Sequence, residues 1–260
     1  MVHVGPPAPV RPADRAATAP ARRGLLPFGD GHVVTYRWGG DDAPVVLLAH
    51  GWQLRASRLA ALTGDLAHAG FQVVAFDAPA HGDSPGRRTH VLQFAEILHL
   101  LADDVAARGG NVAGVVGHSL GGLAAGIAVR EGLGTPRWAT IGAPSSVESV
   151  GQAFARLAGL PRELVPRLNQ AAAARFFAGI PDAWERGDLV ARPAPSDVAA
   201  LFVQDVDDRL LEPGDARRLH AAHPGSELLT TGGLGHNRVL DDLDVRAAVV
   251  QHVTAALLPA

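Results

Sequence analysis

Short apolar runs alternate along this chain with longer segments in which apolar residues recur at helical spacing. A run such as VVLLA at Val45–Ala49 has no polar side on either face, which predicts a short strand buried on both sides of a sheet. The runs that predict strands after an opening hairpin at Leu25–Trp38 are Val45–Ala49, Gln72–Phe76, Val112–Val116, Arg137–Ile141, Val198–Val203 and Glu227–Thr230.

The segments between these runs predict helices over 59–69, 89–108, 120–130, 213–222 and 241–258. Ser57 is placed to cap the first of them. Strands that alternate with helices at this spacing are typical of βαβ units. We therefore expect an α/β fold: a mostly parallel central β-sheet with helices on both faces.

Two segments break this rhythm. Residues 1–24 are rich in Pro, Ala and Arg without apolar periodicity, so we expect a disordered extension. Residues 145–195 contain apolar positions among prolines but no strand, which predicts a small helical lid inserted into the core; two ordinary crossover helices are the alternative. The core would then comprise residues 25–144 and 196–260.

Composition narrows the classes of function. A net charge of −3 gives no basic surface for nucleic acid, and the absence of cysteine excludes disulfides and thiolate metal sites. No apolar run reaches the roughly 18 residues of a membrane span. We expect a cytoplasmic protein, monomeric or homodimeric, with no metal and no cofactor.

The sequence Gly117-His118-Ser119-Leu120-Gly121 joins a predicted strand to a predicted helix. A serine on so tight a turn needs neighbours without side chains two positions before and after it, and Gly117 and Gly121 meet that need. The hydroxyl would stand at the helix N-terminus, where free N–H groups favour developing negative charge. Ser119 is therefore a candidate nucleophile.

A serine nucleophile needs a base to take its proton and a third group to orient that base. The strand at 198–203 runs into Asp205, Asp207 and Asp208, and the strand ending at Thr231 runs into the glycine-flanked His236. The order Ser, Asp, His along the chain is the one reported for the fold in which the nucleophile stands on a sharp turn between a strand and a helix. We expect His236 to be the base and Asp205 to be an exposed loop charge.

Further motifs stand at two other strand ends: His50-Gly51-Trp52, and Asp77-x-Pro79-x-His81-Gly82-x-Ser84. Together with the serine turn and the two downstream loops, they make residues 30 to 258 resemble an α/β-hydrolase. The family's acid loop, His-Gly-x-x-Asp-x-x-Val-Pro, maps onto Gln204–Glu212 and implies Asp208 as the acid. Gln204, Asp205, Leu211 and Glu212 depart from the pattern, so Asp207 stays an alternative.

The resemblance also implies an oxyanion hole made by the backbone amides of Trp52 and Leu120. Residues 77–84 are expected to form a structural turn, with His50 and His81 as packing residues. His118, Phe154 and Trp184 are candidates for substrate binding, with packing as the alternative for His118.

The function implied is a serine hydrolase that cleaves an ester-like bond of a small, partly hydrophobic molecule through an acyl-enzyme. The same residues also serve thioester hydrolysis, acyl transfer, carbon–carbon bond hydrolysis and perhydrolysis. A catalytically silent ligand-binding protein of the same fold is the alternative outside the enzymes.

Overall fold

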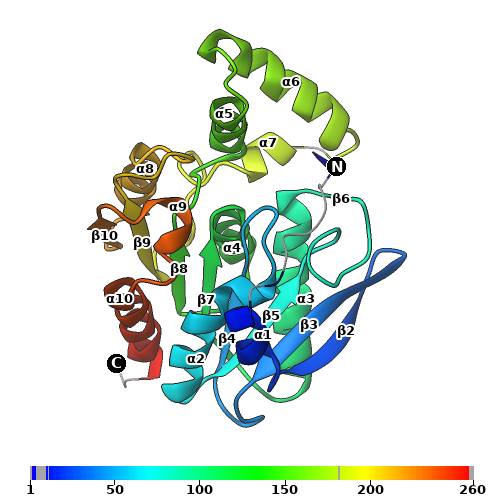
Figure 1. Ribbon diagram of the computed structural model, residues 1–260, viewed down its shortest axis with the longest axis vertical. Helices are drawn as coiled ribbons and strands as arrows, with labels where there is room; N and C mark the ends of the chain where they lie inside the picture. The colour runs from blue at the N-terminus through cyan, green and yellow to red at the C-terminus, as the bar shows by residue number, and fades with distance from the viewer. Residues whose placement is uncertain (1, 4–9, 11, 181, 258–260) are drawn as a thin grey trace.

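The computed structural model describes residues 2–3, 10, 12–180 and 182–257 of the chain. Within these residues, eight strands form one central sheet in the order β10-β9-β8-β7-β4-β5-β3-β2 (Figure 1). Neighbouring strands are parallel except where β3 pairs with β5 and β2, which confirms the predicted class. The strands are β2 Arg22–Phe28, β3 Gly31–Trp38, β4 Val45–Ala49, β5 Gln72–Asp77, β7 Val112–His118, β8 Arg137–Ile141, β9 Ala199–Asp205 and β10 Glu227–Thr231.

Both faces of the sheet are covered by helices, because alternate strand residues point to opposite sides. In β4, Val45, Leu47 and Ala49 join the hydrophobic cluster under the helices α3 (Val91–Ala107), α4 (Leu120–Arg130) and α8 (Gly214–Ala222). Val46 and Leu48 join the opposite cluster, under α2 (Ala60–His68) and α10 (Leu243–Thr254). β4 is thus buried on both faces, as its apolar run predicts.

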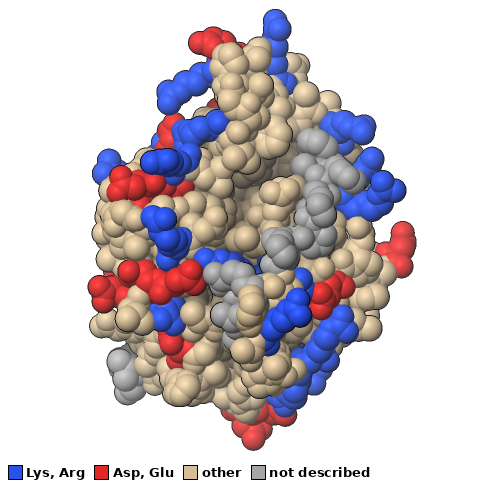
Figure 2. Space-filling view, viewed as in Figure 1, with Lys and Arg blue, Asp and Glu red and all other residues tan. Residues whose placement is uncertain are grey.

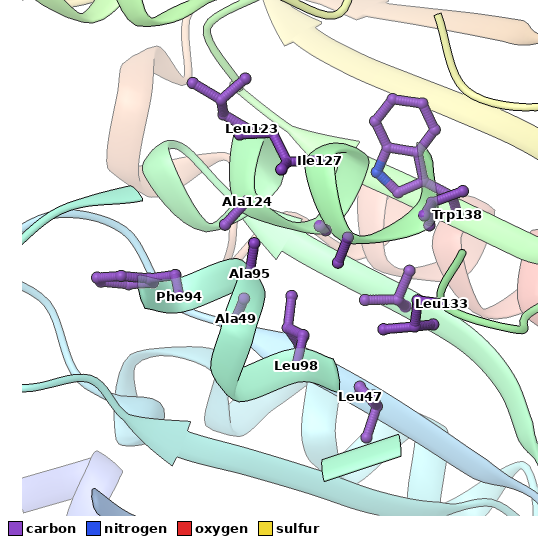
Figure 3. Packing of buried hydrophobic residues seen from close by; sticks show 14 of the residues in the cluster. Leu47, Ala49, Phe94, Ala95, Leu98, Leu123, Ala124, Ile127, Leu133 and Trp138 are labelled. Carbon is purple, nitrogen blue, oxygen red and sulfur yellow. The ribbon is translucent and has the colours of Figure 1, made fainter. Parts of the chain in front are cut away.

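The α3–α4 contact shows how the larger cluster is packed. Figure 3 shows Ala95 of α3 close to Ala124 of α4, with the larger side chains of Leu98 and Ile127 beside this contact and Leu47 in the sheet below. Each of these side chains is at most 1% exposed. Burying a leucine or isoleucine side chain contributes about 1.5–3 kcal/mol, so this contact fixes the helix that begins directly after Ser119.

Residues 145–195 form the helices α5 (Val147–Leu157), α6 (Val165–Phe176) and α7 (Ala183–Arg186), with a 3-10 turn at Arg162–Leu164. Figure 1 shows them together at one end of the molecule, outside the layers that cover the sheet. The Ser146 hydroxyl accepts a hydrogen bond from the Ser149 amide at 3.1 Å and so caps α5. The segment is helical as expected, and its role as a lid stays a prediction.

The N-terminal residues differ from expectation. Residues 1, 4–9 and 11 lie outside the described part. The described residues of 1–24 include both strand and helix. Val2–His3 pairs with Arg88–Thr89 as β1 and β6, Pro12–Thr18 forms α1, and β2 already begins at Arg22. Helix α1 lies against α2 and the 3-10 turn before it, and proline suits its first position. The composition of residues 1–24 does not predict this helix, because contacts with α2 and the 3-10 turn stabilise it.

Two details of the predicted helices are wrong. Ser57 does not cap a helix: it lies inside the 3-10 turn Ala56–Leu59, and its buried hydroxyl has no hydrogen-bond partner among the described residues. The last α-helix spans Leu243–Thr254 and not the predicted 241–258. Its start is set by Asp242, whose carboxylate accepts from the Val245 amide at 3.0 Å. A 3-10 turn follows to Leu257, and residue 258 lies outside the described part.

Candidate functional site

Ser119 connects β7 to α4 in a conformation that few non-glycine residues adopt, with φ 54° and ψ −124°. A Cβ on Gly117 would lie 2.2 Å from the Gly121 carbonyl oxygen, and one on Gly121 would lie 2.3 Å from the Ala49 carbonyl oxygen. The glycines are therefore required by close backbone contacts, as the sequence predicts. Positive φ at a serine costs about 1–3 kcal/mol, and such strain is typical of functional positions.

The structure brings three predicted residues into one hydrogen-bonded series. His236 Nε2 lies 3.0 Å from Ser119 Oγ, and His236 Nδ1 lies 2.7 Å from Asp208 Oδ2. An ionised carboxylate can only accept, so Nδ1 carries the proton and Nε2 is free to accept from the hydroxyl. His236 stands in the short helix α9 (Gly235–Arg238), where the sequence analysis expects a loop.

Asp208 is held as an anion although it is buried. Burial alone would raise its pKa, but hydrogen bonds from His236 and from the Leu211 and Leu210 amides outweigh burial and lower the pKa below its usual value. Gln204 Nε2 donates a further bond to Asp208 Oδ2 at 3.2 Å. Of the two candidate acids, Asp208 is the one that contacts His236. Asp207 is exposed and accepts a hydrogen bond from the Gly233 amide at 2.7 Å.

The third aspartate of this loop, Asp205, is not the exposed charge that the sequence analysis expects. It is 1% exposed, and its carboxylate accepts hydrogen bonds at the base of the loops that carry Asp208 and His236. It lies at the end of β9, where the strand is still covered on both faces, and this explains its burial.

The loop after β4 passes directly beside the serine. A Cβ on Gly51 would lie 3.0 Å from Ser119 Cβ, so the backbone just before Trp52 lies directly beside Ser119. Leu120 is the first residue of α4, and the first amides of a helix have no carbonyl partner within it. The two predicted oxyanion donors therefore belong to segments that meet at Ser119.

His50 and His81 were expected to be packing residues, and they also bind backbone. His81 Nε2 accepts from the Gln53 amide at 3.0 Å, and His50 Nε2 accepts from the Ala78 amide at 3.0 Å. Their Nδ1 atoms face the carbonyl oxygens of Pro79 and Gly51, respectively. Burial lowers the pKa of both imidazoles, so both stay neutral and keep an acceptor nitrogen.

His118 is not placed as a substrate contact. Its side chain is fully buried, and its Nε2 lies 2.9 Å from the His236 carbonyl oxygen, to which it donates. Burial, followed by the nearby His236, lowers the pKa of His118 to about 3. The tight turn directs the His118 ring inward and the neighbouring Ser119 side chain towards the site. The His118 ring therefore holds the backbone of His236 in place.

The other two candidates for substrate binding lie on the helices of residues 145–195. Phe154 on α5 is 54% exposed, and Trp184 on α7 is half-buried with its ring edge-to-face against Phe177 at 6.1 Å between centroids. Figure 2 shows the face of the molecule hollowed between these helices and the body below. Their roles in substrate binding stay predictions.

The described residues contain neither a cluster of metal ligands nor a helix that could span a membrane. In these ranges no three His, Asp or Glu side chains converge as metal ligands. No described helix has both the length and the apolar character that a membrane crossing requires.

Comparison with known proteins extends these observations. Residues 46–253 match the model of the alpha/beta hydrolase family. A bifunctional esterase/perhydrolase of Acinetobacter calcoaceticus is 39% identical over 104 residues, a match that covers 38% of this chain and about a third (36%) of the relative's length.

Solved structures resemble the whole chain at lower identity. An esterase of Pyrococcus furiosus superposes with a TM-score of 0.70 at 16% identity, covering 98% of this chain and 97% of the other. A thioesterase domain from the curacin biosynthetic pathway gives 0.58 at 19%, covering 90% and 99%. At these identities the structures show the fold alone. The family model spans most of the chain, and the chain therefore belongs to the alpha/beta hydrolase family.

Proposed function

We propose that the protein is a serine hydrolase that cleaves a carboxylic ester or thioester bond of a small, partly hydrophobic substrate. The observation that carries the proposal is the series from Ser119 Oγ through His236 to Asp208, with distances of 3.0 and 2.7 Å. Both contacts lie within the range needed for proton transfer between a nucleophile and its base.

In the proposed reaction, Ser119 Oγ attacks the carbonyl carbon while His236 Nε2 takes the hydroxyl proton. Asp208 holds the Nδ1–H and stabilises the imidazolium that forms. The amides of Trp52 and Leu120 donate to the oxyanion, where each donor is typically worth about 3 kcal/mol. His236 then protonates the leaving group, and a water that it deprotonates releases the acyl group from Ser119.

We further propose that α5–α7 cover the substrate as a lid. Phe154 and Trp184 would then contact an apolar acyl or alkyl portion. The exposed position of Phe154 and the hollow in Figure 2 support this arrangement.

The test is reaction of the purified protein with a fluorophosphonate probe and with p-nitrophenyl esters of increasing chain length. We expect labelling and turnover that Ser119→Ala abolishes, with an optimum chain length set by the apolar cover. Labelling that persists in Ser119→Ala, or none in the wild type, contradicts the proposal. Binding of esters without turnover would favour the silent ligand-binding alternative.

Perhydrolysis is a second candidate, favoured by the Acinetobacter calcoaceticus relative, whose name includes that activity. Hydrogen peroxide would replace water in attacking the acyl group on Ser119, giving a peracid and the free serine. Perhydrolysis would be established if the wild type forms peracid from a short ester and hydrogen peroxide and Ser119→Ala forms none. Carboxylic acid as the sole product would exclude it.

A further inference from the structure

Asp205 is a buried carboxylate that the proposed reaction does not use. It is the last residue of β9 and pairs in register with Thr231, the last residue of β10. Figure 1 shows that β9, β10 and the short helix α9 lie side by side at one edge of the molecule. The loop after β9 leads to Asp208, and the loop after β10 leads to His236.

Each oxygen of this carboxylate has two donors. Oδ1 accepts from the Gly235 amide at 2.9 Å and from the Asp207 amide at 3.0 Å. Oδ2 accepts from the Thr231 hydroxyl at 2.8 Å and from the Leu234 amide at 3.1 Å. Burial alone would raise the pKa of Asp205, but these bonds outweigh burial and lower it, so the group stays ionised and keeps all its acceptor sites.

The two amides that donate to Oδ1 belong to the residues directly before the proposed base and the proposed acid. Gly235 immediately precedes His236, and Asp207 immediately precedes Asp208. A single oxygen thus binds the backbone next to the base and the backbone next to the acid. Because the two loops come from different strands, contacts between them set their spacing. The Asp207 carboxylate, which accepts from the Gly233 amide at 2.7 Å, is a second such contact.

We propose that Asp205 is a positioning residue that sets the geometry between Asp208 and His236. This inference rests on the proposed function, since it concerns the same hydrogen-bonded series. Asp205 does not touch the substrate. Its loss would let the two loops move apart, and a displacement of about 1 Å at reacting groups can reduce a rate by about 100-fold.

Asp242 offers a matched control, because its carboxylate also accepts a backbone amide, that of Val245, but it caps α10 and belongs to neither loop. The variants are Asp205→Asn, Asp205→Ala and Asp242→Asn, each checked for folding by circular dichroism. Asp205→Asn is the milder change, since an amide has nearly the shape of the carboxylate and keeps one acceptor oxygen. It carries the test if Asp205→Ala does not fold.

We measure kcat and KM for a p-nitrophenyl ester together with the rate of fluorophosphonate labelling. Asp205→Asn should lower kcat and the labelling rate at least tenfold, with KM changed less than threefold, and Asp205→Ala should lower them further. Asp242→Asn should stay within twofold of the wild type. A loss confined to KM would indicate a general structural effect and contradict positioning.

The two proposals fail in different ways. If the wild type shows no labelling that depends on Ser119, the proposed function is wrong, and the role of Asp205 is wrong with it. If the wild type is labelled and folded Asp205→Asn is labelled within twofold of its rate, only the role of Asp205 is overturned. An equal loss in Asp242→Asn overturns that role as well.

Discussion

Three buried histidines should make the protein sensitive to mild acid. His50 and His118 are fully buried and His90 is nearly so. Burial lowers the pKa of His90 to about 4 and that of His118 to about 3, the latter with a contribution from His236. Burial, followed by the nearby His81, lowers the pKa of His50 well below its usual value. His90 and His118 therefore stay neutral in the folded protein at pH 5, and His50 is shifted in the same direction.

The magnitude follows from proton linkage. In the unfolded chain each histidine has a pKa of about 6.5, so at pH 5 it binds a proton that the folded protein does not bind. The free energy of unfolding falls by RT ln(1 + 10^1.5), about 2 kcal/mol per histidine, between pH 8 and pH 5. His90 and His118 together give about 4 kcal/mol, to which His50 adds in the same direction, and this is comparable with the roughly 5–15 kcal/mol that stabilises a typical domain. Asp77, whose pKa is raised by burial, offsets part of this loss near the acid end.

Urea unfolding followed by circular dichroism at pH 8, 7, 6 and 5 measures this loss. We expect little change from pH 8 to 7 and a steep fall below about pH 6.5. His118→Gln should be less stable than the wild type at pH 8 yet lose about 2 kcal/mol less on acidification. The exposed His32→Gln should lose as much as the wild type. A free energy of unfolding that is constant from pH 8 to 5, or an unchanged loss in His118→Gln, would refute the reasoning.

Two further substitutions, Gly121→Ala and His81→Phe, test the geometry around Ser119, and Gly64→Ala is the control for the first. Gly121→Ala should destabilise the protein by more than about 3 kcal/mol, since its Cβ would lie 2.3 Å from the Ala49 carbonyl oxygen. Gly64→Ala, in open space within α2, should stabilise it by about 0.5–1 kcal/mol; similar unfolding temperatures for the two would be inconsistent with this. His81→Phe removes the acceptor of the Gln53 amide and should lower kcat about tenfold with little effect on KM. Ester kinetics measure it, and an unchanged kcat would show that the Trp52 amide is held without His81.

The elements predicted best are those whose residues are buried on every side. The helix Leu120–Arg130 and the strands Val45–Ala49 and Arg137–Ile141 have the predicted bounds, because continuous apolar sequence permits few other arrangements. The turn at Ser119 is equally local: the glycines and the serine that it requires are adjacent in sequence. Helix α1 is not predicted, because its stability depends on contacts with α2, which is distant in the sequence, and not on a local pattern.

The residues that contact the backbone around the proposed catalytic groups are harder to infer from sequence than those groups themselves. His81, His118 and Asp205 bind backbone amides or carbonyls, and every residue type offers these, so no pattern marks the partner. Their partners Gln53, His236 and Gly235 also lie 28 or more residues away in the sequence. The expectation of packing for the histidines was reasonable, but it omitted the polar atoms that a buried ring must satisfy.

For Asp205 the sequence did contain a usable signal. Along β9, Leu201 and Val203 point to the face packed under α2 and α10, and a period of two places Asp205 on that same face. An aspartate that continues a buried apolar stripe must find hydrogen-bond donors, since an unpaired buried charge costs several kcal/mol. The family pattern has glycine here, which directs attention to Asp208 and away from its neighbour. Strand alternation, applied two residues beyond Val203, the last apolar position, would have identified Asp205 as a buried acceptor between the two loops.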